Sequence, residues 1–230
     1  MNYKLSPSDL TFLYSGCKRC FYNKVVHGVT QPSIPLPAVF SKIAALLKDH
    51  YDGKRTNELH AALPAGFVSH GEQYVKSVII NSINHNATCY ISGRFDIVVT
   101  FDDDTYGIID FKTGKPSNES AKLYSRQLQA YPYALQRPAQ NALTLSPIAK
   151  LGLLYFYPSK TSQQSIEKLA FESEITWIEV ENNEQDFLGF VDEVLGILDK
   201  PEAPESDARC QWCAYPKKLP TSAPLQRKLF

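Results

Sequence analysis

Two charged residues interrupt an apolar, strand-like run in "YGIIDFKTGK" (106–115). Asp110 and Lys112 lie two residues apart, so on a strand their side chains project from the same face. Ionised groups are seldom buried unless they are paired or bind a metal. A carboxylate suits a hard divalent cation, and a lysine suits orienting or deprotonating a water or stabilising charge on a phosphate. The pair therefore indicates metal-assisted hydrolysis, with a purely structural salt bridge as the alternative.

The segment just before this run supplies a second carboxylate. "CYISGRFDIVVTF" is rich in β-branched and aromatic residues and predicts a strand that returns through "DDDT" as a hairpin. If Phe101 pairs with Thr105 around a three-residue loop, Asp96 lies directly opposite Asp110. A five-residue loop would place Asp96 opposite Lys112, and loops of two or four residues would send the carboxylates to opposite faces. Opposed like charges destabilise a sheet unless a cation lies between them, so the first register predicts a Mg²⁺ or Mn²⁺ site.

The elements that hold this hairpin follow from periodicity and capping signals. Ser6 and the following proline begin a first helix, and further helices are predicted over 38–51, 119–136 and 184–200. Strands are predicted over 74–80, 89–101, 106–112, 148–158 and 175–181. This order predicts a mixed sheet with helices packed on it, an α/β or α+β sandwich. Gln127 and Tyr131 share a face of the third helix and could contact a phosphate or a base.

Four of the five cysteines form two C-x-x-C pairs near the ends of the chain: Cys17 with Cys20, and Cys210 with Cys213. Four thiolates would bind either one tetrahedral zinc ion or a [4Fe–4S] cluster, and either would clamp the two ends together. Unlinked thiols are the alternative. The remaining Cys89 begins a strand and is expected to be structural.

The composition restricts the class of protein. Lys plus Arg and Asp plus Glu number 24 each, so the net charge is zero and the chain lacks a global basic signature of nucleic-acid binding. No apolar stretch reaches the roughly 18 residues of a transmembrane helix, and the first residues lack the apolar core of a secretory signal. We therefore expect a cytoplasmic protein.

Together, "GRFD", "IIDFKTGK" and "QLQAY" resemble the core of the PD-(D/E)XK nuclease superfamily. The resemblance is to its RecB-like branch, which includes the RecB and AddB nuclease domains and the CRISPR-associated RecB-like exonucleases. In that pattern, Asp96 matches the first acid, Asp110 and Lys112 match the acid and lysine of the next strand, and Gln127 and Tyr131 match the helical motif. The N-terminal "SPSDLTFLYSGCKRCFY" resembles the branch's N-terminal segment.

The resemblance implies an α/β, restriction-endonuclease-like fold in a single domain over 1–230. Its terminal segments, 1–27 and 201–230, would form the cysteine module. It further implies Mg²⁺- or Mn²⁺-dependent hydrolysis of DNA phosphodiesters by an exonuclease that acts on single strands or DNA ends, with a role in DNA repair. The backbone carbonyl of Phe111 would be a further metal ligand. Relatives carry a [4Fe–4S] cluster, which favours that cluster over zinc, although their cysteines divide one and three rather than two and two.

One departure concerns the early helix at 38–51. Many members of the branch place a His or Glu ligand there, and this helix offers no obvious equivalent. His50, His60 and His70 are candidates by position only. The missing ligand favours an alternative function, a metal-stapled DNA-binding or assembly protein that does not cut.

Possible DNA contacts gather near the cysteines. Aromatic residues there could stack on unpaired bases and basic residues could bind phosphates; the alternative is that they pack around the metal site or are simply solvated. The aromatic residues are Tyr22, Trp212 and Tyr215, and the basic ones are Lys18, Arg19, Lys24, Arg209, Lys217 and Lys218. "KTGKP" with Arg126 forms a second basic cluster beside the proposed metal, or else a polar loop and helix start.

Overall fold

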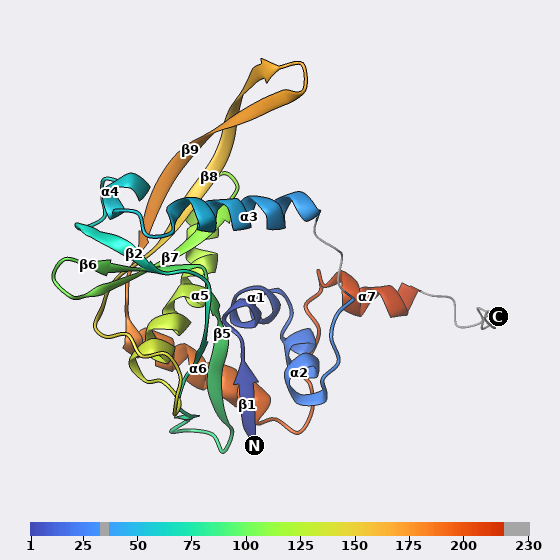
Figure 1. Ribbon diagram of the computed structural model, residues 1–230. Coiled ribbons are helices and arrows are strands. Elements are labelled where there is room, and N and C mark those ends of the chain that lie inside the picture. Colours follow the sequence, from blue (N-terminus) through green and yellow to red (C-terminus); the bar gives the residue numbers. More distant parts are fainter. Residues whose placement is uncertain (33–36, 219–230) are drawn as a thin grey trace, which may run out of the picture.

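The computed structural model describes residues 1–32 and 37–218, and its strands form two sheets (Figure 1). The larger sheet has the order β2 (Gly66–His70), β6 (Ile97–Phe101), β7 (Tyr106–Thr113), β8 (Ile148–Ser165) and β9 (Lys168–Val180). In the smaller sheet, β5 (Thr88–Phe95) pairs in parallel with β1 (Asn2–Leu5) and antiparallel with β3 (Gln73–Lys76) and β4 (Ile80–Asn81). The larger sheet is mixed, because β7 and β8 are parallel while its other pairs are antiparallel.

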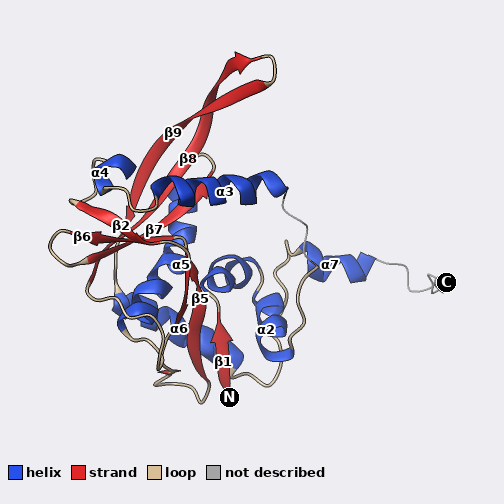
Figure 2. Cartoon of the chain, viewed as in Figure 1, coloured by secondary structure: helices blue, strands red, loops and turns tan. Residues whose placement is uncertain are grey.

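Helices cover both faces of the larger sheet (Figure 2). On one face lie α5 (Asn118–Gln136) and α6 (Glu184–Leu198); on the other lie α3 (Ala38–Tyr51) and α4 (Thr56–Leu59). The predicted α/β class with a mixed sheet flanked by helices is confirmed. Within residues 1–32 and 37–218, no helix is both long and apolar enough to cross a membrane.

The chain ends carry short helices. The first predicted helix is divided into η1 (Asp9–Leu13, a π-helix), α1 (Tyr14–Gly16) and α2 (Lys18–His27), and α7 (Gln211–Lys218) follows α6. The division falls at Cys17, whose backbone is extended. Ser6 accepts a hydrogen bond from the backbone N–H of Asp9 at 3.1 Å, as its capping role requires.

Strand β7 is fixed by two separate hydrophobic clusters. Ile108 is fully buried in the larger cluster, together with residues of α5 and α6. Ile109 and Phe111 belong to the second cluster, against Tyr51 of α3. The alternation predicted from the sequence is therefore confirmed, and Asp110 shares the face of Ile108 toward α5.

The hairpin has the register that the three-residue loop predicts. Ile97 pairs with Ile109, and the backbone N–H of Phe101 donates to the carbonyl of Thr105 at 2.8 Å. The single strand predicted over 89–101 is wrong in one respect, because Asp96 separates β5 from β6. At that point the chain passes from the smaller sheet to the larger one.

The glycine of "GRFD", Gly93, is required for a steric reason. A Cβ at this position would lie 2.6 Å from Cδ of Pro7, so only glycine lets the N-terminal segment pack against β5.

The hairpin of β8 and β9 is longer than predicted. Its strands run to Ser165 and from Lys168, and their distal half extends beyond the rest of the sheet (Figure 1).

Candidate active site

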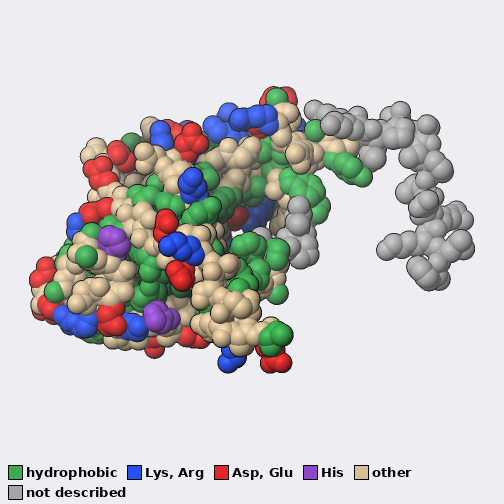
Figure 3. Space-filling model, turned by 90° about the horizontal axis from the view of Figure 1, so that it is seen from above, with side chains coloured by type: hydrophobic (Ala, Val, Ile, Leu, Met, Phe, Trp, Pro, Cys, Tyr) green, Lys and Arg blue, Asp and Glu red, His purple; other side chains and the backbone are tan. Residues whose placement is uncertain are grey.

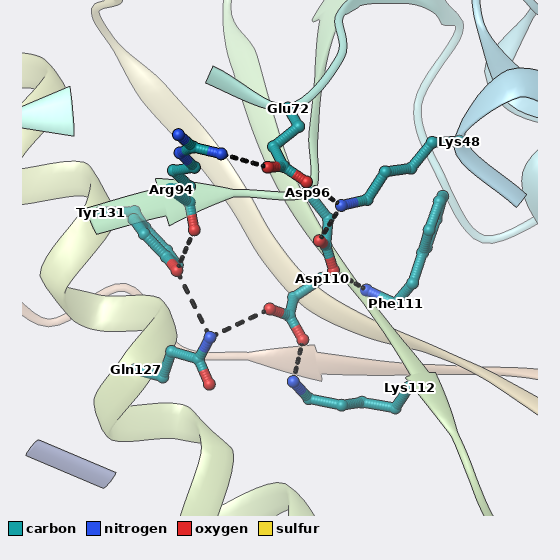
Figure 4. A network of polar contacts seen from close by, with 9 residues as sticks. All are labelled: Lys48, Glu72, Arg94, Asp96, Asp110, Phe111, Lys112, Gln127 and Tyr131. Carbon is teal, nitrogen blue, oxygen red and sulfur yellow. Dashed lines mark hydrogen bonds and ion pairs between the residues drawn. The ribbon is translucent and has the colours of Figure 1, made fainter. Parts of the chain in front are cut away.

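Asp110 is a buried carboxylate at the centre of a polar network (Figure 4). Its Oδ1 accepts a hydrogen bond from Nε2 of Gln127 at 3.3 Å, and its Oδ2 lies in ionic contact with the ammonium of Lys112. Burial raises the pKa of Asp110 to about 6, against the opposing effect of Lys112 and with the help of the nearby Asp96 carboxylate. The fold therefore holds this carboxylate where ionisation is costly unless positive charge is added.

One buried oxygen of the network, Oε1 of Gln127, has no hydrogen-bond partner in the described part of the chain. Among the same residues, Oδ2 of Asp110 has only the ammonium of Lys112 beside it. The Lys112 ammonium also lies over the ring of Tyr124, 4.1 Å from its centroid. Oxygens of this kind are the ligands that Mg²⁺ and Mn²⁺ prefer, so the residues present fit a hard divalent cation.

Asp96 faces Asp110 from the junction of β5 and β6 (Figure 4). Its Oδ2 accepts a hydrogen bond from the backbone N–H of Phe111 at 2.9 Å. In a regular sheet, a carbonyl of the neighbouring strand would accept from this N–H. On a strand, the N–H and C=O of one residue point to the same side, so the Phe111 carbonyl is directed to the edge where Asp96 lies. The register and this hydrogen bond bring together the three residues predicted to hold the metal.

Gln127 and Tyr131 of α5 belong to the hydrogen-bond network around Asp110, and the side chain of Tyr131 is buried beneath the protein surface. The Tyr131 hydroxyl donates to the carbonyl of Arg94 at 2.6 Å and lies 3.3 Å from Nε2 of Gln127. Tyr131 is 2 % exposed, and burial raises its pKa above the ordinary range. In this arrangement both side chains orient Asp110 and fix the end of β5, and direct contact between Tyr131 and a substrate would require it to become accessible.

Two residues of the network have no counterpart in the sequence prediction. Lys48, on α3, lies 2.8 Å from Oδ1 of Asp96 and 2.5 Å from Oε2 of Glu72. Glu72 also pairs with Arg94 at 3.1 Å. The pairing of β3 with β5 is the signal that could have located Glu72. Gln73 pairs with Phe95, so the preceding Glu72 comes beside Asp96.

The three histidine candidates make other contacts. Nε2 of His50 lies 3.2 Å from Lys54, Nδ1 of His60 accepts from a backbone N–H, and Nδ1 of His70 lies 2.9 Å from the hydroxyl of Ser69. Within residues 1–32 and 37–218, no His or further carboxylate closes a group of three ligands with Asp96 and Asp110.

The four cysteines of the two C-x-x-C pairs come together where α2 meets the start of α7. Their sulfurs all lie within 4.8 Å of one another, with separations of 3.9 Å from Cys17 to Cys213, 3.7 Å from Cys20 to Cys210 and 3.5 Å from Cys20 to Cys213. Burial disfavours the Cys17 thiolate, but hydrogen bonds from the backbone at Cys20 and Asp207 lower its pKa to about 7. A four-cysteine group suited to a metal is therefore present, and Cys89 is buried apart from it.

The predicted DNA contacts near the cysteines are met only in part. Trp212 and Tyr215 are exposed, whereas Tyr22 is buried and donates its hydroxyl to the carbonyl of Lys200, which excludes it as a stacking surface in this structure. Lys24 pairs with Asp9 at 2.5 Å.

The other basic candidates are less concentrated than predicted. Arg209 pairs with Asp207 at 3.4 Å, and Arg126 donates to Ser15 and lies over the ring of Phe190. The side chains of Lys217 and Lys218 lie outside the described residues. Seen from above, basic and acidic side chains are interspersed rather than gathered by sign (Figure 3).

Three comparisons place the chain among known proteins, and the family match carries the conclusion. Residues 36–217 match the sequence profile of the PD-(D/E)XK nuclease superfamily. The crystal structure of SSO0001 matches 94% of this chain and 85% of that protein, with 16% sequence identity and a TM-score of 0.49. A search of curated proteins found no match. Because the profile covers most of the chain, including both carboxylates, Lys112 and the second cysteine pair, the chain belongs to the PD-(D/E)XK nuclease superfamily.

Proposed function

We propose that the protein is a Mg²⁺- or Mn²⁺-dependent deoxyribonuclease of the RecB-like branch, acting as an exonuclease on single-stranded DNA or DNA ends. The observation that carries the proposal is the pair Asp96 and Asp110, which face each other from the β5–β6 junction and from β7, beside Lys112 and the unpaired buried oxygen of Gln127.

The chain's residues have separable tasks in such a reaction. Asp96, Asp110 and the carbonyl of Phe111 would hold the ion, which supplies Lewis-acid activation of the phosphate and of water. Lys112 would orient the attacking water or stabilise charge on the phosphate. Hydrolysis forms a bond from water oxygen to phosphorus and breaks the bond to the leaving sugar oxygen, which takes up a proton. Gln127 keeps Asp110 in place through its hydrogen bond.

The test is cleavage of end-labelled DNA with Mn²⁺ by the purified protein and by Lys112→Ala. We expect the native protein to shorten single-stranded DNA from an end. The variant should lose activity by about 100-fold or more while keeping its circular dichroism spectrum and melting temperature. Full activity in the variant would contradict the role of Lys112, and internal cuts in circular single strands would contradict the exonuclease assignment.

For the four-cysteine site, we propose one tetrahedral zinc ion rather than the [4Fe–4S] cluster that the family resemblance favours. Thiolates bound to one zinc at about 2.3 Å stand roughly 3.8 Å apart, which agrees with the 3.5–3.9 Å of three sulfur pairs and with the 4.8 Å that bounds them all. In a cubane cluster each thiolate binds a different iron, so the sulfurs must stand further apart. Anaerobic purification and metal analysis decide this: we expect colourless protein with one zinc per chain, and brown protein with four irons would overturn it.

A second candidate function is supported by one observation. Among the described residues, no third carboxylate or histidine lies close enough to Asp96 and Asp110 to complete a group of three metal ligands. A protein that binds DNA without cutting it would not need that third ligand. The labelled-DNA assay separates the two candidates, because binding of single-stranded DNA without degradation in Mn²⁺ would support the second.

A further inference from the structure

Lys48 links two acidic residues beside the candidate metal site. Its ammonium lies 2.8 Å from Asp96 and 2.5 Å from Glu72, and Glu72 in turn contacts Arg94 at 3.1 Å (Figure 4). The Lys48 side chain is 19% exposed, so it is held in place rather than free in solvent. Charges therefore alternate along Asp96, Lys48, Glu72 and Arg94.

This arrangement affects how many ions the site can hold. Two-metal hydrolases place their ions about 3.5–4 Å apart, so carboxylate oxygens have to face both positions. Asp110 lies on one side of Asp96, in contact with Lys112. On the side of Lys48, the oxygens of Asp96 and Glu72 already converge on a positive charge. A second ion there would meet the ammonium and would have to displace it.

We propose that Lys48 is a built-in cation that takes the place of a second metal ion, so that the site binds a single divalent ion between Asp96 and Asp110. The inference rests on the proposed function, because it assigns a metal stoichiometry to that same site. Lys48 acts as a positioning residue: it fixes Oδ1 of Asp96 while the Phe111 N–H fixes Oδ2. Each oxygen keeps a second lone pair for the ion.

The position of Lys48 on α3 explains why a carboxylate or histidine is dispensable there. A further carboxylate or histidine would serve to bind a second metal ion. The Lys48 ammonium already supplies the positive charge that this ion would bring. A hollow of about 730 Å³, lined by Lys48, Glu72 and residues of α3, adjoins this part of the site. Water can therefore reach the position that Lys48 occupies, and removing the ammonium would leave Asp96 and Glu72 facing a hydrated gap.

The experiment counts Mn²⁺ ions by the loss of the free-ion EPR signal on titration. The double variant Asp96→Asn/Asp110→Asn provides the blank for ions bound elsewhere, including at the cysteines. We expect one ion above the blank in the native protein and two in Lys48→Ala. Lys48→Arg, which keeps the charge, should bind one. Lys42→Ala provides the matched control, because Lys42 is exposed on the same helix.

Two ions in the native protein, or one or fewer in Lys48→Ala, would overturn the inference. If the alanine variant proves unstable, Lys48→Gln replaces it with the same expected count. Cleavage of labelled DNA is measured on the same samples, so the two proposals fail separately. Expected ion counts without any cleavage would refute the nuclease assignment alone, and cleavage with two ions in the native protein would refute only the role of Lys48.

Discussion

Replacing Asp110 by Asn should stabilise the protein when Mg²⁺ and Mn²⁺ are absent, although it removes a central residue of the site. Burial raises the pKa of Asp110 to about 6 from an ordinary value of 3.8. A shift of roughly two pKa units, at ~1.36 kcal/mol each, means that ionised Asp110 costs the folded state about 3 kcal/mol at neutral pH. Asparagine removes that cost but leaves Lys112 without its partner. We therefore expect a net gain of about 1–2 kcal/mol in the free energy of unfolding at pH 7.

The sign of the pH dependence follows from the direction of the shift. Between about pH 4 and 6, folded Asp110 binds its proton while the unfolded chain has lost it. The contribution of this residue to stability therefore falls as the pH rises through that window. The difference in stability between Asp110→Asn and the native protein should accordingly increase from pH 4 to 7, by about 3 kcal/mol at most.

Urea unfolding at several pH values measures this difference, with equal metal content at the cysteines in both proteins. Asp104→Asn is the matched control: Asp104 is an exposed residue of the same hairpin loop, and its φ of 63° suits asparagine equally well. Adding Mn²⁺ at 100 times its dissociation constant should stabilise the native protein by about 2.7 kcal/mol and leave Asp110→Asn unchanged. If Asp110→Asn were less stable than the native protein at pH 7 without these ions, or if the difference did not grow with pH, the reasoning about burial would be refuted.

Three further changes test the surroundings of the site. Gly93→Ala should lower the free energy of unfolding by about 1–3 kcal/mol, because its Cβ would lie 2.6 Å from Pro7; unchanged urea unfolding would show that the N-terminal segment moves aside freely. Tyr131→Phe should cost about 1–3 kcal/mol, since it removes the 2.6 Å hydrogen bond from the buried Tyr131 hydroxyl to the carbonyl of Arg94; an equal melting temperature would mean that water replaces the hydroxyl. Cys20→Ser should reduce the metal content at the cysteines and lower the melting temperature, as metal analysis and calorimetry would show; full retention of metal would contradict the four-thiolate site.

The sequence predicted those parts of the site that depend on local periodicity. Alternation along β7 placed Asp110 and Lys112 on one face, and the loop length set the register that opposes Asp96 to Asp110. The break at Asp96 was not predicted, because the β-branched and aromatic residues on both sides outweigh Gly93 and Asp96, which are weak strand formers. The break arises from a tertiary contact, the hydrogen bond from the N–H of Phe111.

Lys48 and Glu72 were missed for a related reason. Each comes from a different element, and they meet Asp96 only because α3 packs across the larger sheet while β3 pairs with β5. A lysine on an amphipathic helix normally indicates a solvated face, and no spacing rule connects residue 48 to residue 96. The C-x-x-C spacing of the cysteines, by contrast, predicts a common metal site, although the distances between their sulfurs come from the structure alone.

The fixing of β7 by two hydrophobic clusters restricts how the gene for this protein can change. A one-residue insertion or deletion between Ile108 and Lys112 would exchange the two sets of side chains. An acid would then enter an apolar cluster, and an aliphatic side chain would face the candidate metal site. Codon substitutions at this strand can therefore be tolerated one at a time, whereas changes of length are confined to loops that do not set the register of the site, such as the 166–167 tip of the long hairpin. The loop 102–104 is not among them, because its length opposes Asp96 to Asp110.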